Sequence, residues 1–129
     1  MKVFLDSNVL ISAGVFRSKA ILNFLDFVEN KHEIILSESV IRECLGVVKT
    51  KMPLYEERFC EFLNLLDYEQ VDVDTHGLDV RIRDTEDKHV VLSALQSGAD
   101  VLVTGDKDFF DYDYDIEVLT PADFLLKYK

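Results

Sequence analysis

Short apolar runs separated by polar segments recur along the chain. Four are continuous and short enough for strands buried on both faces, whereas "EQVDVD" at 69–74 alternates and predicts a short strand or an extended segment. The continuous runs occupy residues 2–6, 32–37, 99–104 and 116–120. The first run stops on Asp6 and apolar residues resume at Val9, so the opening segment "KVFLDSNVLIS" raises the question of why a core strand ends on a carboxylate.

Between these runs, apolar residues recur at helical spacing. The pattern predicts helices over 18–30, from Ser37 to Val48, from Pro53 to Leu66, over 86–97 and over 120–128. Ser18, Ser37 and Thr120 are suited to cap three of these helices, and Gly98 is suited to end a fourth. The remaining long polar stretches are predicted to be loops: 75–87 and 105–115.

Alternating strands and helices predict a parallel sheet with helices on both faces. We therefore expect an α/β protein, a three-layer α/β/α domain with a mainly parallel central sheet of about four or five strands. The sequence contains no repeat, low-complexity tract or linker, so residues 1–129 are expected to form a single domain.

Composition narrows the functional classes. The chain has 129 residues, 48% of them hydrophobic, and a formal net charge of −11. Such acidity opposes non-specific binding to nucleic acid and suits a protein that binds metal cations or a basic partner. No apolar stretch is long enough to span a membrane and the N-terminus lacks the features of a signal peptide, so we expect a soluble, cytoplasmic protein. Cys44 and Cys60 lie in apolar helical patterns and are expected to be reduced core thiols.

Acidic residues gather where the predicted strands end. Asp6 ends the first strand, Asp106 follows the strand at 99–104, and Asp87 lies in the first turn of the helix that leads into that strand. Glu43 sits at the border of an apolar helical stripe, close to buried surface. Because ligands bind parallel sheets at the carboxyl ends of the strands, we expect these acids at one edge. Clustered carboxylates raise one another's pKa values unless a cation such as Mg²⁺ offsets their charge.

Each acid also has an ordinary structural explanation. Asp6 could bond its own backbone in a turn, and Asp87 could favour a helix N-terminus. Glu43 could be an exposed helical acid, and Asp106 a loop acid. Taken singly, these explanations outweigh a catalytic role, but the topology that sends all four acids to one edge favours a shared site.

Four segments resemble the PIN domain family, the fold of many metal-dependent ribonucleases, to which VapC-like and PilT N-terminus-like domains belong. The segments are "FLDSNVLIS", "SESVIRECLG", "DTEDKHVVLSALQSGAD" and "VLVTGDKDF". They span nearly the whole chain, and their order and spacing fit the family. The opening motif together with "VTGDKDF" makes the resemblance specific.

The resemblance maps the family's four acids onto Asp6, Glu43, Asp87 and Asp106. Asp84 could share or take the third role, Asp108 could support or replace the fourth, and Asn8 matches a polar position that accompanies the first. The family implies Mg²⁺ or Mn²⁺ as cofactor, with Asp6, Asp87 and Asp106 as the metal ligands. Glu43 would act as a ligand through water or would orient the nucleophile.

The resemblance also implies an activity and partners. The expected activity is metal-dependent endoribonuclease cleavage of RNA phosphodiester bonds, in the toxin of a toxin–antitoxin pair. An antitoxin protein and a second copy of the chain, forming a homodimer, are the expected partners. The alternative is a non-catalytic PIN-like or receiver-like metal-binding regulatory module. A receiver is disfavoured because no paired acids end the first strand and no lysine follows the last strand.

Basic and aromatic residues near the predicted site are candidates for RNA contacts. Candidates for binding the substrate phosphate are Lys107, Arg42, Arg17 and Lys19, with Arg81 and Arg83 ranked after them. In "DFFDYDYDIE", Phe109 is expected to pack into the core, whereas Tyr112 and Tyr114 are left open between base stacking, loop packing and a dimer surface. His89 follows Asp87 by two positions and is expected to face away from it into solvent.

Overall fold

A five-stranded parallel sheet forms the centre of the molecule. The computed structural model describes residues 1–129, and the strands lie in the order β3-β2-β1-β4-β5. They are β1 (Lys2–Leu5), β2 (Glu33–Ser37), β3 (Glu69–Val71), β4 (Val101–Val103) and β5 (Glu117–Leu119). The predicted parallel sheet is confirmed, and the alternating segment at 69–74 supplies its edge strand β3.

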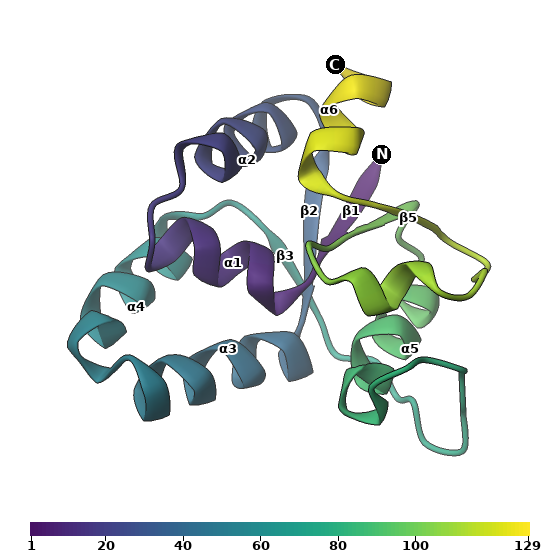
Figure 1. The fold of residues 1–129 in the computed structure, drawn as a ribbon. Helices are drawn as coiled ribbons and strands as arrows, with labels where there is room; N and C mark the ends of the chain where they lie inside the picture. Colours follow the sequence, from purple (N-terminus) through teal and green to yellow (C-terminus); the bar gives the residue numbers. More distant parts are fainter.

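Helices cover both faces of this sheet (Figure 1). The α-helices are α1 (Ser7–Gly14), α2 (Lys19–Lys31), α3 (Glu38–Lys51), α4 (Glu56–Leu65), α5 (Lys88–Gln96) and α6 (Pro121–Tyr128). Three short 3₁₀ helices are η1 (Pro53–Tyr55), η2 (Thr85–Asp87) and η3 (Lys107–Phe110). Because crossovers between parallel strands are right-handed, this strand order puts α1 to α4 on one face and α5 on the other. The three-layer α/β/α prediction is confirmed.

The hydrophobic core fills the space between the sheet and its helices. Five phenylalanines are fully buried in it: Phe4, Phe24, Phe59, Phe109 and Phe124. Each buried ring contributes roughly 1.5–3 kcal/mol relative to an exposed one, so these side chains fix the layers. The predicted burial of Phe109 is confirmed, and Cys44 is buried and Cys60 half-buried, both as free thiols. None of the helices combines the length and apolarity needed to cross a membrane.

Helix α1 answers the question that the opening segment raises. Asp6 is the residue that caps this helix, and its side chain accepts a hydrogen bond from the Ser7 N–H at 2.7 Å. The second apolar run is therefore helical, with Val9, Leu10 and Ala13 buried. The sequence pattern predicted no element at residues 7–14, because this helix follows the strand with no intervening loop.

Other helix ends agree with the sequence signals in part. The Ser37 and Thr120 hydroxyls accept hydrogen bonds from backbone N–H groups of α3 and α6, as predicted. Ser18 occupies the predicted N-cap position of α2, but its side chain accepts no such bond. The helix predicted from residue 86 begins at Lys88, because η2 occupies the preceding turn. Gly98 follows the end of α5 with a φ of +77°, which favours glycine.

Candidate functional site

The carboxyl ends of β1 and β4 bring distant parts of the chain together. These strands are parallel neighbours in which Leu5 pairs with Val103, so Asp6 and Thr104 leave the sheet side by side. The Asp6 N–H donates to the Val103 carbonyl at 3.0 Å. In the sheet, β2 lies on one side of β1 and β4 lies on the other side of it. This edge is therefore the point where strand order reverses, the usual ligand position in such sheets.

Asp6 is buried at this point, with 3% of its surface exposed. One carboxylate oxygen accepts from the Ser7 N–H at 2.7 Å, and the other accepts from the Thr104 hydroxyl at 2.7 Å. Burial raises the pKa of Asp6, while the Thr104 and Ser7 hydrogen bonds act in the opposite direction. The carboxylates of Glu43 and Asp106 add to the increase in its pKa. Asp6 is thus a carboxylate whose orientation is fixed by hydrogen bonds and whose pKa is raised further by the charges of Glu43 and Asp106.

Thr104 and Asn8 complete a network around Asp6, and we call Asp6, Thr104 and Asn8 the inner corner. The buried Thr104 hydroxyl also accepts from the Asp106 N–H at 3.1 Å and lies 3.4 Å from the Asn8 side-chain nitrogen. The Asn8 side-chain oxygen accepts from the Gly105 N–H at 3.1 Å. Asn8 therefore holds the start of the loop after β4 against the start of α1.

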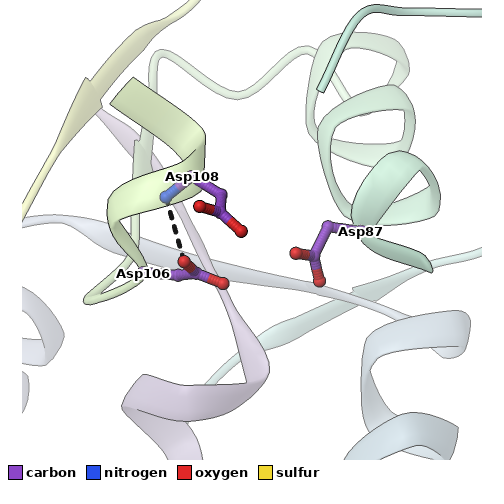
Figure 2. Close-up of side chains that lie close together, drawn as sticks. All are labelled: Asp87, Asp106 and Asp108. Atoms are coloured by element: carbon purple, nitrogen blue, oxygen red, sulfur yellow. Dashed lines mark hydrogen bonds between the residues drawn. The ribbon is translucent and has the colours of Figure 1, made fainter. Parts of the chain in front are cut away.

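Asp87, Asp106 and Asp108 form a second group, which we call the outer cluster (Figure 2). One oxygen of each carboxylate lies within 4.8 Å of the others, and all three side chains are half-buried. Asp106 caps η3, since its side chain accepts from the Asp108 N–H at 3.0 Å. Asp87 comes from η2 on the other side of the space between them. The two short 3₁₀ helices thus aim their acids at one another.

The crowding of the acids changes their electrostatics. Burial, followed by the charges of Asp106, Asp6, Asp84 and Glu43, raises the pKa of Asp87 to about 7. Asp84 itself is exposed, caps η2 by accepting from the Glu86 N–H at 3.0 Å, and stays outside the outer cluster. The structure therefore gathers Asp87, Asp106 and Asp108, with Asp6 buried behind them.

Glu43 and His89 contact each other, and the predicted solvent-facing orientation of His89 is wrong. The His89 Nε2 lies 3.3 Å from a Glu43 oxygen, and its Nδ1 lies 3.2 Å from the Ser39 hydroxyl. The Glu43 oxygen is buried and has no hydrogen-bond partner, so its approach to His89 is a close contact that becomes an ion pair when the ring is protonated. The Glu43 carboxylate raises the pKa of His89. Packing of α3 against α5 creates this pair, and no local sequence signal marks it.

The basic residues lie unevenly around the acids. Lys107 is exposed between Asp106 and Asp108 in the chain. Arg42 pairs with Glu38 one helical turn away and lines a hollow of ≈ 390 Å³ with Ser39, Glu43 and His89. Arg17 lies after α1, at the end opposite Asp6, and Lys19 begins α2. The arginine that reaches the outer cluster is Arg83, whose guanidinium lies 3.7 Å from the Asp108 carboxylate.

Several solved structures have a similar fold. One is VapBC2 from Rickettsia felis, bound to a DNA fragment from the VapBC2 promoter. Its TM-score is 0.68, and the two sequences are 20% identical over 92% of this chain and 97% of that one. VapBC-1 from nontypeable Haemophilus influenzae has a TM-score of 0.65 and 16% identity, covering 95% and 99%. FitAcB from Neisseria gonorrhoeae has a TM-score of 0.61 and 19% identity, covering 93% and 98%. At these identities the similarity establishes the fold.

Sequence comparisons address the family directly. No curated protein sequence gives a significant match to the chain. The sequence model of the PIN domain matches residues 2–108, which include the inner corner and the outer cluster. This match covers well over half of the chain, and the chain therefore belongs to the PIN domain family.

Proposed function

We propose that this PIN domain is a Mg²⁺- or Mn²⁺-dependent endoribonuclease that hydrolyses RNA phosphodiester bonds. The observation that carries the proposal is the convergence of Asp87, Asp106 and Asp108 to within 4.8 Å, directly outside the buried carboxylate of Asp6. PIN domains are generally nucleases, and carboxylate groups at a sheet switch point suit a divalent cation.

The residues present fit a hard divalent cation. The outer cluster offers only carboxylate oxygens, the ligand type that Mg²⁺ and Mn²⁺ prefer. The pKa of Asp87 is raised to about 7 by burial and by its acidic neighbours, which is the strain that a bound cation relieves. The buried Glu43 oxygen without a hydrogen-bond partner is a further unsatisfied acceptor at the same edge.

Each acid has a distinct proposed role. Asp6, Asp87 and Asp106 are the proposed metal ligands, with Asp108 supporting them. Glu43 is proposed to bind through a water or to orient the nucleophile. When bound, the cation supplies Lewis-acid polarisation of a water and of a phosphate oxygen.

The surrounding side chains fix these acids in place. Thr104 and Ser7 hold the two oxygens of Asp6, so its carboxylate cannot rotate away. Asn8 ties the loop that carries Asp106 to the first turn of α1. His89 lies against Glu43 and keeps that carboxylate at the edge of the sheet.

We further propose that the protein is the toxin of a toxin–antitoxin pair, with an antitoxin protein as partner and a homodimer as its assembly. The support is the resemblance to VapC-like toxins and the similarity in fold to two VapBC structures. The net charge of −11 suits a nuclease that needs a specific target. Leu54 and Leu65, at the two ends of the η1–α4 segment, are 94% and 85% exposed and offer apolar surface for such partners.

Metal titration tests the nuclease proposal. Mn²⁺ is titrated into the wild type, Asp6→Asn and Asp87→Asn by calorimetry, and RNA cleavage is measured in parallel. We expect each substitution to weaken metal binding and to reduce cleavage more than about 100-fold, since changing residues that only orient metal ligands already costs about 10–100-fold. Glu57→Gln, which removes an exposed acid in the first turn of α4, is the matched control and should leave both unchanged.

Unchanged cleavage in both site variants would end the catalytic assignment. Metal binding without any cleavage by the wild type would favour the non-catalytic regulatory module. A receiver-like role would appear as covalent labelling by a small phosphodonor. The burial of Asp6, with both oxygens already hydrogen-bonded, argues against that role.

A further inference from the structure

An arginine lies at the rim of the outer cluster in this strongly acidic chain. The Arg83 guanidinium is 2.9 Å from the Asp111 carboxylate and 3.7 Å from that of Asp108, yet 68% of the side chain is exposed. A guanidinium carries five donors, and these two contacts leave several of them facing solvent. Arg83 therefore presents positive charge directly beside acids that belong to the proposed metal site.

A second arginine holds an aromatic ring next to Arg83. The Arg81 guanidinium carbon lies 4.6 Å from the centre of the Tyr112 ring, which is 37% exposed. Ile82, between the two arginines, is buried, so it anchors the segment while both arginines remain exposed. The Tyr114 hydroxyl donates to the Arg81 carbonyl at 2.6 Å and joins the two segments again. Arg83 and Tyr112 thus place an exposed guanidinium and an exposed aromatic ring on two segments that are tied together.

We propose that Arg83 and Tyr112 form the strand-binding edge of the acidic site, and that the substrate they hold is single-stranded RNA. Arg83 contacts a phosphate next to the one that is cleaved, and Tyr112 stacks on an unpaired base. This inference rests on the proposed nuclease function. It explains how a chain with a net charge of −11 approaches RNA, since the positive charge is placed at the acids where the strand must pass.

The single-strand preference follows from the chemistry of the ring. An exposed aromatic face recognises a base only when the base is unstacked, which a duplex prevents. Arg42 is a weaker candidate for this role because its ion pair is with Glu38, outside the outer cluster, whereas Arg83 contacts Asp108 of that cluster. Arg17 was a phosphate candidate from the sequence, but it lies at the far end of α1 from Asp6, so we expect it to lie away from the bound strand and use it as the control.

Binding is measured by fluorescence anisotropy with a labelled ten-nucleotide oligouridylate, in an Asp87→Asn background that prevents cleavage. We expect Arg83→Gln to weaken binding about 10-fold and to reduce the salt slope by about one, while Arg17→Gln changes neither. Tyr112→Ala should weaken binding about 10-fold, and Tyr112→Phe should retain it. Duplex RNA of the same length should compete poorly.

One further pair of variants separates phosphate binding from a role that only fixes the loop. If Arg83 merely fastened the loop through Asp111, then Asp111→Asn would weaken RNA binding as Arg83→Gln does. If Arg83 binds phosphate, Asp111→Asn releases it and tightens binding more than Asp113→Asn, the control that removes an equal charge nearby. The unfolding temperature of each variant is measured beside its affinity.

Equal affinity of Arg83→Gln and Arg17→Gln, equal affinity of the two Tyr112 variants, or equal competition by duplex RNA overturns the inference. Failure of the proposed function is a different outcome, because it is the absence of metal-dependent cleavage by the wild type. The anisotropy series does not depend on cleavage, so it decides the role of Arg83 and Tyr112 in either case.

Discussion

The inner corner and the outer cluster hold the same acidic residue type in different surroundings. In the inner corner, both oxygens of Asp6 accept hydrogen bonds from groups that the fold holds in place. In the outer cluster, three carboxylates face one another and the pKa of Asp87 is raised to about 7. The first arrangement gives its carboxylate two hydrogen bonds that oppose the effect of burial on its pKa, whereas the second crowds carboxylates whose charge a cation can offset.

The two regions differ in the elements that supply their residues. The donors to Asp6 come from β4 and from the first turn of α1, which are parts of the folded core. The outer acids come from the 3₁₀ helices η2 and η3 and from the residue that caps η3, and both helices are short elements. The inner corner therefore stabilises the fold while it holds Asp6 at the proposed metal site, whereas the outer cluster contributes to binding at a cost in stability. Substitutions in the two regions should change stability in opposite directions.

The largest effect on stability is expected from Thr104→Val. This change keeps the shape of the buried side chain but removes the hydroxyl that donates to Asp6 and accepts from the Asp106 N–H. Losing a hydrogen bond to a buried charged group should lower the free energy of unfolding by about 2–3 kcal/mol. Urea denaturation measures this loss, and Thr104→Ser, which keeps the hydroxyl, is the control. Equal stability of the valine and serine variants would contradict the role given to the inner corner.

The second prediction concerns Glu43, the acid between the two regions. His89→Gln keeps a side-chain N–H donor near the position of Nε2, whereas His89→Asn keeps one near Nδ1 and leaves Glu43 without its neighbour. If His89 positions Glu43, metal-dependent cleavage should fall about 10-fold in His89→Asn and be largely retained in His89→Gln. The turnover number and KM are measured separately, because misplacement of Glu43 should lower turnover. Equal loss in both variants would show that the ring itself, and not its contact with Glu43, is required.

The sequence predicted the fold well because the fold depends on local periodicity. Each strand was recognised, including the alternating edge strand β3. Helix α1 was missed although its signals are present: Asp6 is a favourable cap, and Val9, Leu10 and Ala13 follow at helical spacing. Their position immediately after the apolar strand made the two runs look like one interrupted segment.

The site was harder to predict because its details depend on packing and on short turns. The topology alone implied that Asp87 and Asp106 would approach each other. The entry of Asp108 into the outer cluster depends on η3, a single turn without a periodic signal. The contact between His89 and Glu43 depends on how α3 meets α5. If Asp87 and His89 belonged to one α-helix, their side chains would point in different directions. Asp87 belongs to the 3₁₀ helix η2, so this helical spacing does not apply and the expected direction of His89 is wrong.

The third prediction compares the stability effects of the same substitution, Asp to Asn, in the two regions. Asp87→Asn removes a charge that its neighbours disfavour, so it should raise the stability of the metal-free protein at pH 8. Because the carboxylate is partly exposed and water screens it, we expect a gain of about 1 kcal/mol. Asp6→Asn should instead destabilise, since an amide cannot accept from both Ser7 and Thr104. Thermal unfolding in a chelator measures both variants, and a stability change of the same sign in both would remove the distinction.

The smallest effect is the pH dependence of the gain in Asp87→Asn. The pKa of Asp87 is about 7 in the folded protein against an ordinary value of 3.8, so between these values the folded state binds more protons than the unfolded state. Wild-type stability should therefore rise as pH falls through 7, and should fall again as pH rises. The amide cannot titrate, so the advantage of Asp87→Asn should be largest at pH 8 and shrink toward pH 5. His89 and Asp6 titrate in both proteins and largely cancel in this difference. If the advantage stays constant from pH 5 to pH 8, the pKa of Asp87 is not raised by burial and the neighbouring acids. The carboxylates of the outer cluster would then cost the fold no stability, and the contrast with the inner corner would be lost.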